Sequence, residues 1–303
     1  MTQTPQQRQT LKYFNRVAGN WRQKAEGLNA KKKFNVIAAR NDCVLHVADT
    51  MKEVRTALDV GCGTGELVID LAKRGIDAIG IDFAPDMISL CKEKAAAEGA
   101  KKASFLHASI YDYAPVGISY DLIAANGFIE YVSDEELDRF LAHMATLVSP
   151  QGRLVVGSRN RLFNIPSLND FTVMEKENGS LLSLIDEAML IANGKDQQSL
   201  IKDLILRTTH YPRHERHPDT GIGVTIRYQY TPAELIDRMA RHGFETVALV
   251  PVHYHGMTPM MKAKHPEIHV QIAELLQSIA EDSPSLIPFA STFMITARLA
   301  SKR

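Results

Sequence analysis

A glycine-rich run followed by a distant acid is the strongest chemical signal in this chain. The run Asp59-Val-Gly-Cys-Gly-Thr-Gly65 joins the apolar segment 57–60 to an amphipathic segment that begins at Glu66. Glycines let the backbone turn sharply and bring a ligand close to bare peptide groups. Asp82 follows about 20 residues after the first glycine, the offset at which a carboxylate accepts hydrogen bonds from ribose hydroxyls. The pattern predicts a nucleoside ligand, and the alternative for Asp82 is a simple cap on the next helix.

The spacing of the glycines separates two classes of nucleoside ligand. A dinucleotide fingerprint requires G-x-G-x-x-G, with the pyrophosphate on the helix N-terminus. Here the spacing is G-x-G-x-G, and Glu66 stands where the third glycine would fall. A carboxylate in the first helical turn competes with a pyrophosphate for the positive end of the helix. NAD and FAD are therefore disfavoured. The run instead resembles the first motif of the class I S-adenosylmethionine (SAM)-dependent methyltransferases, whose ligand carries no phosphate.

This resemblance implies SAM as the cofactor and gives roles to residues at the ends of several predicted strands. Asp59 and the glycine run would hold the methionine end of SAM, and Asp82 would hold the ribose. Many members of the family have an aspartate where this chain has Ser109, so either Ser109 or a backbone group is expected to meet the adenine. The residues expected to contact SAM are Trp21, Asp59, Gly61, Cys62, Gly63, Gly65, Asp82, Phe83, Met87, Ser109, Ile110, Asn126 and Gly127.

Methyl transfer from a sulfonium needs few catalytic groups, because the electrophile is already activated. The site must align the nucleophile with the methyl–sulfur bond and exclude water, and a hydroxyl acceptor also needs a base. Many members of the family have a histidine where this chain has Tyr131, so a histidine base at that point is excluded. The candidate catalytic residues are His210, His253 and Tyr131.

Cationic and aromatic side chains gather in the segments that the resemblance does not cover. Such groups suit a carboxylate or phosphate on the methyl acceptor, and the alternative for each is a solvated loop residue without a role. The H-x-x-x-H spacing of His210 and His214 has no carboxylate or cysteine at ligand spacing, so no metal site is predicted. The residues expected to bind the acceptor are Arg159, Asn160, Tyr211, Arg213, Tyr254 and His255.

The elements that must position these residues follow from alternating apolar segments and turn signals. The order resembles the class I methyltransferase sheet. It implies a doubly wound, mostly parallel α/β sheet of seven strands with the last strand antiparallel, plus N-terminal helices and helical cap insertions. The predicted strands are residues 57–60, 78–83, 103–109, 120–126, 152–159, 244–250 and 291–298.

Four parts organise the predicted chain. They are an N-terminal helical lid at 1–50, a SAM-binding core at 51–160, a cap insertion at 161–223, and completion of the core sheet at 224–303 with a second insertion at 252–283. Residues 1–10 are expected to be a loose tail. The aromatic run from Tyr13 to Trp21 resembles the lid of small-molecule methyltransferases, and plain packing on the sheet is the alternative.

Composition limits the class of protein. The 303 residues are 45% hydrophobic and 23% charged, which is typical of a soluble globular chain, and the formal net charge is zero. Nothing global therefore indicates nucleic acid or an anionic membrane as a partner. Three cysteines without a close pair suggest reduced thiols in a cytoplasm. No apolar run approaches the roughly 20 residues of a membrane span.

These observations predict methylation of a small anionic metabolite or biosynthetic intermediate. Oxygen is the first expectation for the accepting atom, nitrogen the second, and carbon is a further alternative. A protein or nucleic-acid methyltransferase and a non-catalytic SAM-binding regulator are the alternatives from other classes. The acceptor and the oligomeric state stay open.

Overall fold

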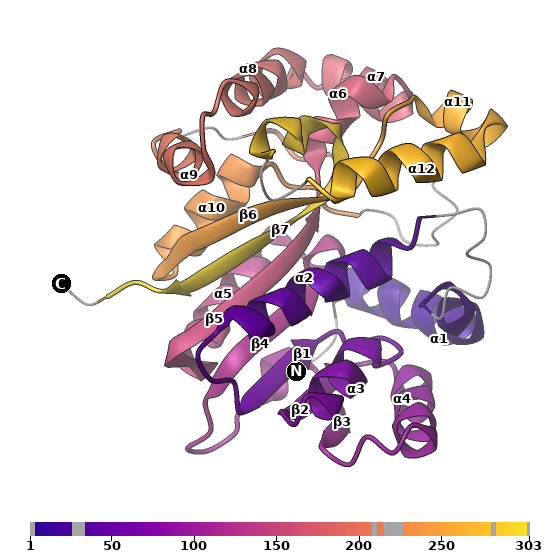
Figure 1. Ribbon diagram of the computed structural model, residues 1–303, viewed down its shortest axis with the longest axis vertical. Coiled ribbons are helices and arrows are strands. Elements are labelled where there is room, and N and C mark those ends of the chain that lie inside the picture. Colours follow the sequence, from indigo (N-terminus) through magenta and orange to yellow (C-terminus); the bar gives the residue numbers. More distant parts are fainter. Residues whose placement is uncertain are drawn as a thin grey trace.

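A seven-stranded sheet is the framework of the part of the chain that the structure describes. The computed structural model describes residues 4–25, 34–207, 211–214, 218, 227–279 and 283–301, with side chains described outside 17–25. The strands are β1 (Thr56–Val60), β2 (Asp77–Asp82), β3 (Ala103–His107), β4 (Tyr120–Asn126), β5 (Val148–Arg159), β6 (Phe244–Tyr254) and β7 (Ala290–Leu299). Their order is β3-β2-β1-β4-β5-β7-β6 (Figure 1). Strands β1 to β5 pair in parallel, and β7 runs antiparallel to β5 and β6. The predicted fold class is confirmed, including the antiparallel last strand.

Helices accompany the sheet along its whole length. They are α1 (Pro5–Ala25), α2 (Val36–Thr50), α3 (Glu66–Lys73), α4 (Pro85–Ala97), α5 (Asp134–Leu147), α6 (Asn164–Ser167), α7 (Asp170–Glu177), α8 (Leu181–Ala192), α9 (Gln197–Ile205), α10 (Pro232–Arg241), α11 (Pro259–Lys264) and α12 (Pro266–Gln277). Among the described residues, no helix combines the length and the apolar character that a membrane crossing requires.

Successive side chains of a strand point to opposite faces of the sheet. Helices cover both faces, so both sets of side chains are buried. Ala57 of β1 packs with α2 and α3 in one apolar cluster. Its neighbour Leu58 packs in the other cluster with α5 and α10. Figure 1 shows α2 in front of the central strands and α5 behind them. This double covering explains why the central strands read as continuous apolar runs.

Helix α1 begins at Pro5, so the prediction of a loose tail is wrong for residues 5–10. A reciprocal cap starts the helix: the Gln7 amide donates to Thr4 Oγ1 at 3.2 Å, and the Thr4 amide donates to Gln7 Oε1 at 3.1 Å. Gln7 Nε2 also donates to Glu136 Oε1 at 2.6 Å. That bond joins the start of α1 to the start of α5.

The insertion after β5 folds around a buried ion pair. Arg161 Nε lies 3.0 Å from Glu175 Oε1 and Arg161 Nη2 lies 2.8 Å from Glu175 Oε2, a two-point contact between buried groups. Ser180 donates to the same carboxylate at 2.7 Å. Helices α8 and α9 follow this pair in the chain. Figure 1 shows α6 to α9 grouped at one end of the molecule.

Strand β6 continues past the predicted end at Val250 as far as Tyr254. Pairing with β7 extends it, since Tyr254 lies opposite Ala290. β6 and β5 both run antiparallel to β7, so they point the same way and their carboxyl ends reach the same edge of the sheet. His253 and Tyr254 are therefore strand residues at that edge, where the sequence predicted an insertion.

Candidate active site

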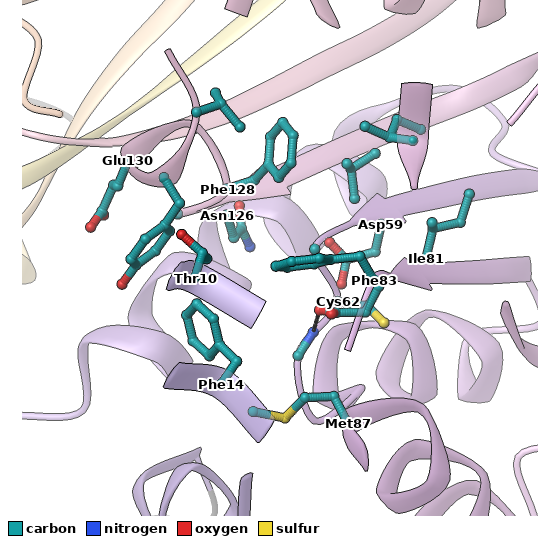
Figure 2. Close-up of a pocket in the computed structure, with 18 of the residues that line it drawn as sticks. Thr10, Phe14, Asp59, Cys62, Ile81, Phe83, Met87, Asn126, Phe128 and Glu130 are labelled. Atoms are coloured by element: carbon teal, nitrogen blue, oxygen red, sulfur yellow. Dashed lines mark hydrogen bonds between the residues drawn. The ribbon is translucent and has the colours of Figure 1, made fainter. Parts of the chain in front are cut away.

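A cavity lies at the carboxyl edge of the parallel strands, the edge at which open α/β sheets bind their ligands (Figure 2). The ends of β1, β2 and β4 form its floor, and α1 and α2 contribute one wall. Its lining residues are Gln7, Thr10, Phe14, Ile37, Arg40, Asn41, Asp59, Val60, Gly61, Cys62, Gly63, Thr64, Glu66, Leu67, Ile81, Asp82, Phe83, Met87, Ala108, Ser109, Ile110, Tyr111, Asn126, Gly127, Phe128, Glu130, Tyr131, Val132 and Arg227.

The glycine run after β1 has a conformation that side chains would strain. Gly61, Gly63 and Gly65 have φ values of 72°, 54° and 80°, in the left-handed region that favours glycine. Gly61 and Gly63 line the cavity. Gly65 stands outside the lining, and a Cβ there would lie 2.8 Å from the ring of Phe105. We infer that Gly65 serves the close packing of α3, rather than contact with a ligand.

One end of the cavity is acidic. Asp59, Glu66 and Asp82 all line it, and Asp59 and Asp82 are buried. Burial, together with the negative charges of Asp82 and Glu66, raises the pKa of Asp59 to about 8. Glu66 is held at the start of α3 by Lys94, whose Nζ lies 2.8 Å from Glu66 Oε1. Carboxylates packed this closely favour a cationic ligand, which would relieve their repulsion.

Asp82 is fixed by backbone groups on both of its oxygens. Gly63 N donates to Oδ2 at 3.1 Å and Ala84 N donates to Oδ1 at 2.8 Å. Burial raises the pKa of Asp82 to about 6, although these backbone hydrogen bonds oppose the rise. A carboxylate oxygen accepts more than one hydrogen bond, so the fixed group can still receive ribose hydroxyls. The structure places the acid beside the glycine run, as the ribose interpretation requires.

Apolar side chains line the cavity beside its acidic end. Phe83, Met87 and Ile110 line this region together with Ser109. In Figure 2, the ring of Phe83 projects into the cavity between Asp59 and Met87. The Ser109 hydroxyl accepts from Tyr111 N at 3.3 Å, which starts a short 3-10 helix at Ile110. A flat aromatic ligand such as an adenine suits this slot.

The opposite end of the cavity is built around the buried Glu130, which has two arginine partners. Arg40 Nη2 lies 3.0 Å from Glu130 Oε1, and Arg227 Nη2 contacts Glu130 Oε2. Burial alone would raise the pKa of Glu130, but the charges of Arg227 and Arg40 outweigh it and lower the pKa below its ordinary value. Figure 2 shows Glu130 on the far side of Asn126 from Asp59 and Cys62. The two ends of the cavity therefore differ in charge.

A third arginine adds to the positive charge at this end. Loss of solvent and the neighbouring charge of Arg227 lower the pKa of Arg159 to about 10, while Glu130 opposes the shift. Arg227 also lies over the ring of Tyr131, 5.4 Å from its centroid. Burial raises the pKa of Tyr131 to about 12, with Arg227 opposing the rise. Tyr131 therefore stays a phenol at neutral pH; it lines the cavity, and the catalytic role expected from sequence stays a prediction.

The structure brings most of the residues expected to contact SAM to this one cavity. Gly65 is outside the lining, and the side chain of Trp21 lies outside the described residues. Asn126 Nδ2 donates to Asn41 Oδ1 at 3.0 Å, while Asn126 Oδ1 is buried without a partner among the described residues. That oxygen is free to accept a hydrogen bond from a ligand.

Most of the residues expected to bind the acceptor hold the structure together instead. Asn160 Nδ2 donates to the carbonyls of Ile287 and Ala290, and Tyr211 donates to Glu187 at 2.7 Å. Arg213 pairs with Asp134 and Glu234. Tyr254 is fully buried in a small apolar cluster. None of these side chains reaches the cavity lining.

The candidate histidines do not line the cavity either. His210 lies outside the described residues. His253 and His255 lie close to each other, with ring centroids 4.2 Å apart, and neither belongs to the lining. The structure therefore gives no support to His253 as the base that acts on the acceptor in this cavity.

Sequence reasoning missed several lining residues that come from outside the core motifs. Gln7, Thr10 and Phe14 reach the cavity from α1, Arg40 from α2, and Arg227 from the segment before α10. The ring of Phe14 meets that of Tyr131 edge-on at 5.1 Å. The aromatic run of α1 was a usable signal. The arginines carried none, because neither belongs to a motif of fixed spacing.

Comparisons with known proteins place a methyltransferase domain in this chain. Residues 57–152 match the family model described as a methyltransferase domain. A ubiquinone biosynthesis O-methyltransferase of Azorhizobium caulinodans is 33% identical over 104 residues, covering 34% of this chain and 40% of that protein. A magnesium-protoporphyrin O-methyltransferase of Rhodobacter capsulatus is 30% identical over 87 residues, covering 29% of this chain and 38% of that protein. The chain thus spans well under half the length of each of these relatives.

Solved structures agree with the fold over most of the chain. A magnesium protoporphyrin IX methyltransferase from Synechocystis PCC 6803, with bound SAH, has a TM-score of 0.53 at 17% identity, covering 96% of this chain and 98% of that one. The CcbJ methyltransferase from Streptomyces caelestis has a TM-score of 0.52 at 15% identity, covering 87% and 90%. At these identities, the likeness establishes the fold that the glycine run suggested.

Proposed function

We propose that this chain, whose residues 57–152 form a methyltransferase domain within a class I methyltransferase fold, transfers a methyl group from SAM to an oxygen of a small anionic acceptor. The observation that carries the proposal is the polarity of the cavity. Its acidic end is made by Asp59, Glu66 and Asp82, and its cationic end by Arg40 and Arg227 on either side of Glu130. Arg159, expected from sequence to bind the acceptor, lies near this end but outside the cavity lining.

The acidic end is suited to the cofactor. SAM carries a sulfonium and an ammonium group against one carboxylate, so it is a net cation, and it brings no phosphate to compete with Glu66. Asp82 would hold the ribose, the glycine run the methionine end, and Phe83 with Ile110 the adenine. When bound, SAM supplies an activated methyl group and a neutral thioether as the leaving group.

The cationic end is suited to an acceptor that reacts as an anion. Two arginines contact one carboxylate and the charge of Arg159 lies nearby, so the region has excess positive charge. A positive field of this kind lowers the pKa of a phenol, enol or carboxylic acid and favours its ionised form. The acceptor can then lose its proton to solvent as it enters the site. A dedicated base is unnecessary, which agrees with the high pKa of Tyr131.

Helix α1 supports a covering role. Gln7, Thr10 and Phe14 line the cavity from this helix, and Phe14 contacts Tyr131. We propose residues 1–50 as a lid that excludes water from the methyl group during transfer. Residues 161–223 would act as a cap that supports the site from outside: no described residue of that range lines the cavity, and Arg213 pairs with Asp134 and Glu234.

The relatives favour oxygen as the accepting atom. Both curated relatives described above are named O-methyltransferases of biosynthetic intermediates. Their likeness covers only 34% and 29% of this chain, so we infer the nature of its acceptor from its own arginines.

A transfer assay with SAM labelled in the methyl group tests the proposal. The acceptors would be matched phenols, carboxylic acids, amines and neutral alcohols. Product is expected from an ionisable hydroxyl compound. Arg227→Met should raise the KM for that acceptor by roughly 10- to 100-fold and leave the Kd for SAM within about twofold, because only the acceptor end loses charge. Arg241→Met, on the exposed face of α10, is the control. Transfer to amines alone would contradict the oxygen assignment.

A further inference from the structure

Three histidines from separate segments meet beside the cavity, at the carboxyl edge of the sheet. His253 and His255 come from the end of β6 and the residue after it, and His269 comes from α12. Each offers one ring nitrogen, and these three atoms lie within 4.8 Å of one another. The sequence analysis predicted no metal site on the spacing of His210 and His214, and it did not consider these three, of which His269 stands 14 residues after His255. The fold brings His269 next to the other two histidines by packing α12 on β6.

The ring nitrogens of this cluster have unmet bonding capacity. Both nitrogens of His255 and Nδ1 of His269 are buried without a hydrogen-bond partner among the described residues. A buried polar atom without a partner costs free energy, so such a group in a folded protein requires an explanation. Imidazole binds metals through the lone pair of a ring nitrogen, so these unpartnered atoms are available to an ion.

The backbone at His253 is held in a strained conformation that aims its ring at the cluster. Its φ is +61°, a value that is uncommon for a residue other than glycine. Gln277 clamps the strand there: its Oε1 accepts from His253 N at 3.0 Å, and its Nε2 donates to the Pro251 carbonyl at 3.0 Å. Strain that persists under such bracing is typical of functional sites.

The distances suit a tetrahedral metal. His253 Nε2 lies 3.1 Å from His269 Nε2. Two nitrogens bound at the Zn–N distance, in tetrahedral geometry, would lie about 3.3 Å apart. Among the described residues, the ring of His255 has no hydrogen-bond partner, so it can approach the other two rings without breaking a hydrogen bond. The Ser291 hydroxyl, within 3.4 Å of the His253 carbonyl, also lies 3.0 Å from His253 Nδ1. When the Ser291 hydroxyl donates to that carbonyl, its oxygen accepts from the Nδ1–H group of His253. Nε2 of His253 then carries no proton and keeps its lone pair for a metal.

Aromatic side chains enclose two of the three rings. Phe34 stacks on His253 with centroids 4.8 Å apart, and Phe163 contacts His255 at 4.4 Å. An apolar shell of this kind limits solvent access and strengthens the bonds of a bound ion.

We propose that His253, His255 and His269 form a binding site for a divalent transition-metal ion, with zinc as the best fit. Three imidazoles suit zinc, copper, nickel or cobalt better than magnesium or calcium, which prefer oxygen ligands. Three protein ligands leave the fourth tetrahedral position open, as in zinc sites that bind water or a substrate oxygen. This site does not rest on the proposed methyl transfer, because none of its ligands lines the cavity.

Titration with Co²⁺, then with competing Zn²⁺, tests the site in full-length protein from which any affinity tag has been removed. One Co²⁺ per chain is expected, with the visible absorption of a tetrahedral complex, and Zn²⁺ should displace it. His255→Ala and His269→Ala should each weaken binding at least about 100-fold, and Ser291→Ala about 10-fold. Lys262→Met should tighten binding, since it removes a nearby positive charge.

His265→Ala is the matched control, because this exposed histidine begins α12 without belonging to the cluster. Circular dichroism and thermal unfolding would establish that each variant is folded. Wild-type protein that binds Co²⁺ no more tightly than His269→Ala would overturn the proposal, and so would an equal loss of affinity in His265→Ala. The wild-type titration decides the question even if a ligand variant fails to fold.

Discussion

At the scale of single residues, the acidic end of the cavity holds carboxylates in an environment that disfavours their charge. Asp59 and Asp82 are buried at adjacent strand ends, and burial raises the pKa of both. In a protein without a ligand, that arrangement costs stability. A bound cation repays the cost, because the ionised carboxylates then have a partner. Such conflicts between stability and local charge are typical of binding sites.

Asp59→Asn should therefore stabilise the free protein, and more so at alkaline pH. The pKa of Asp59 is raised to about 8 in the folded state, so between about pH 4 and 8 the folded state holds a proton that the unfolded state has lost. Stability consequently falls as pH rises through this window. Asparagine has no carboxyl group to titrate, so Asp59→Asn removes this loss of stability. We expect the free energy of unfolding to rise by about 1–3 kcal/mol at pH 8 and to change little at pH 5.

Thermal unfolding of both proteins at pH 5 and pH 8 measures this difference. The same variant should bind SAM more weakly, which separates the effect from a general improvement of packing. An equal change in Tm at the two pH values would show that Asp59 is not the source of the pH dependence.

At the scale of elements, the cap insertion depends on one buried ion pair. Arg161 and Glu175 are both almost fully buried, and Glu175 also accepts from Ser180 and Asn164. Burial alone would raise the pKa of Glu175, but hydrogen bonds from His214 and Arg161 lower it well below its ordinary value. The pair fixes η4 (Arg161–Phe163) to α7, and so it fixes the chain directly after β5.

Glu175→Ala should destabilise the protein by about 3–5 kcal/mol, because it leaves the Arg161 charge buried without its partner. Urea unfolding measures the loss. Glu177→Ala, at the end of the same helix, is the matched control and should change stability by less than about 0.5 kcal/mol. A loss in Glu175→Ala no larger than in the control would mean that the insertion is held by its apolar contacts alone.

The sequence could predict the elements of the core because their signals are local. The glycine run, the alternation of apolar segments and the offset of Asp82 all lie within about 30 residues, so they read as one βαβ unit. The cationic end has no such signal. Arg40, Glu130 and Arg227 come from three distant segments, and only the folded sheet brings them together. For the same reason the sequence left Tyr211 and Arg213 available for an acceptor, whereas the buried Glu187 binds Tyr211 and the partly exposed Asp134 binds Arg213.

At the scale of the whole molecule, charge is separated within one cavity although the chain as a whole is neutral. Residues at the ends of the core strands and at the start of α3 form the acidic end of the cavity. Residues of α1, α2 and the segment before α10 form most of the cationic end. This division explains how one conserved type of core can serve many acceptors, since the acceptor end is built from segments outside it. It also explains why total composition carried no information about the ligand.

Calorimetric titration of the purified protein with SAM, S-adenosylhomocysteine and NAD tests the central claim most directly. The account predicts Kd values on the order of micromolar for the first two and no binding of NAD, because Glu66 opposes a pyrophosphate. Asp82→Asn should weaken SAM binding by about 10- to 100-fold, and the exposed Asp86→Asn should leave it unchanged. Binding of NAD alone, or equal SAM affinity in Asp82→Asn and wild type, would contradict the account.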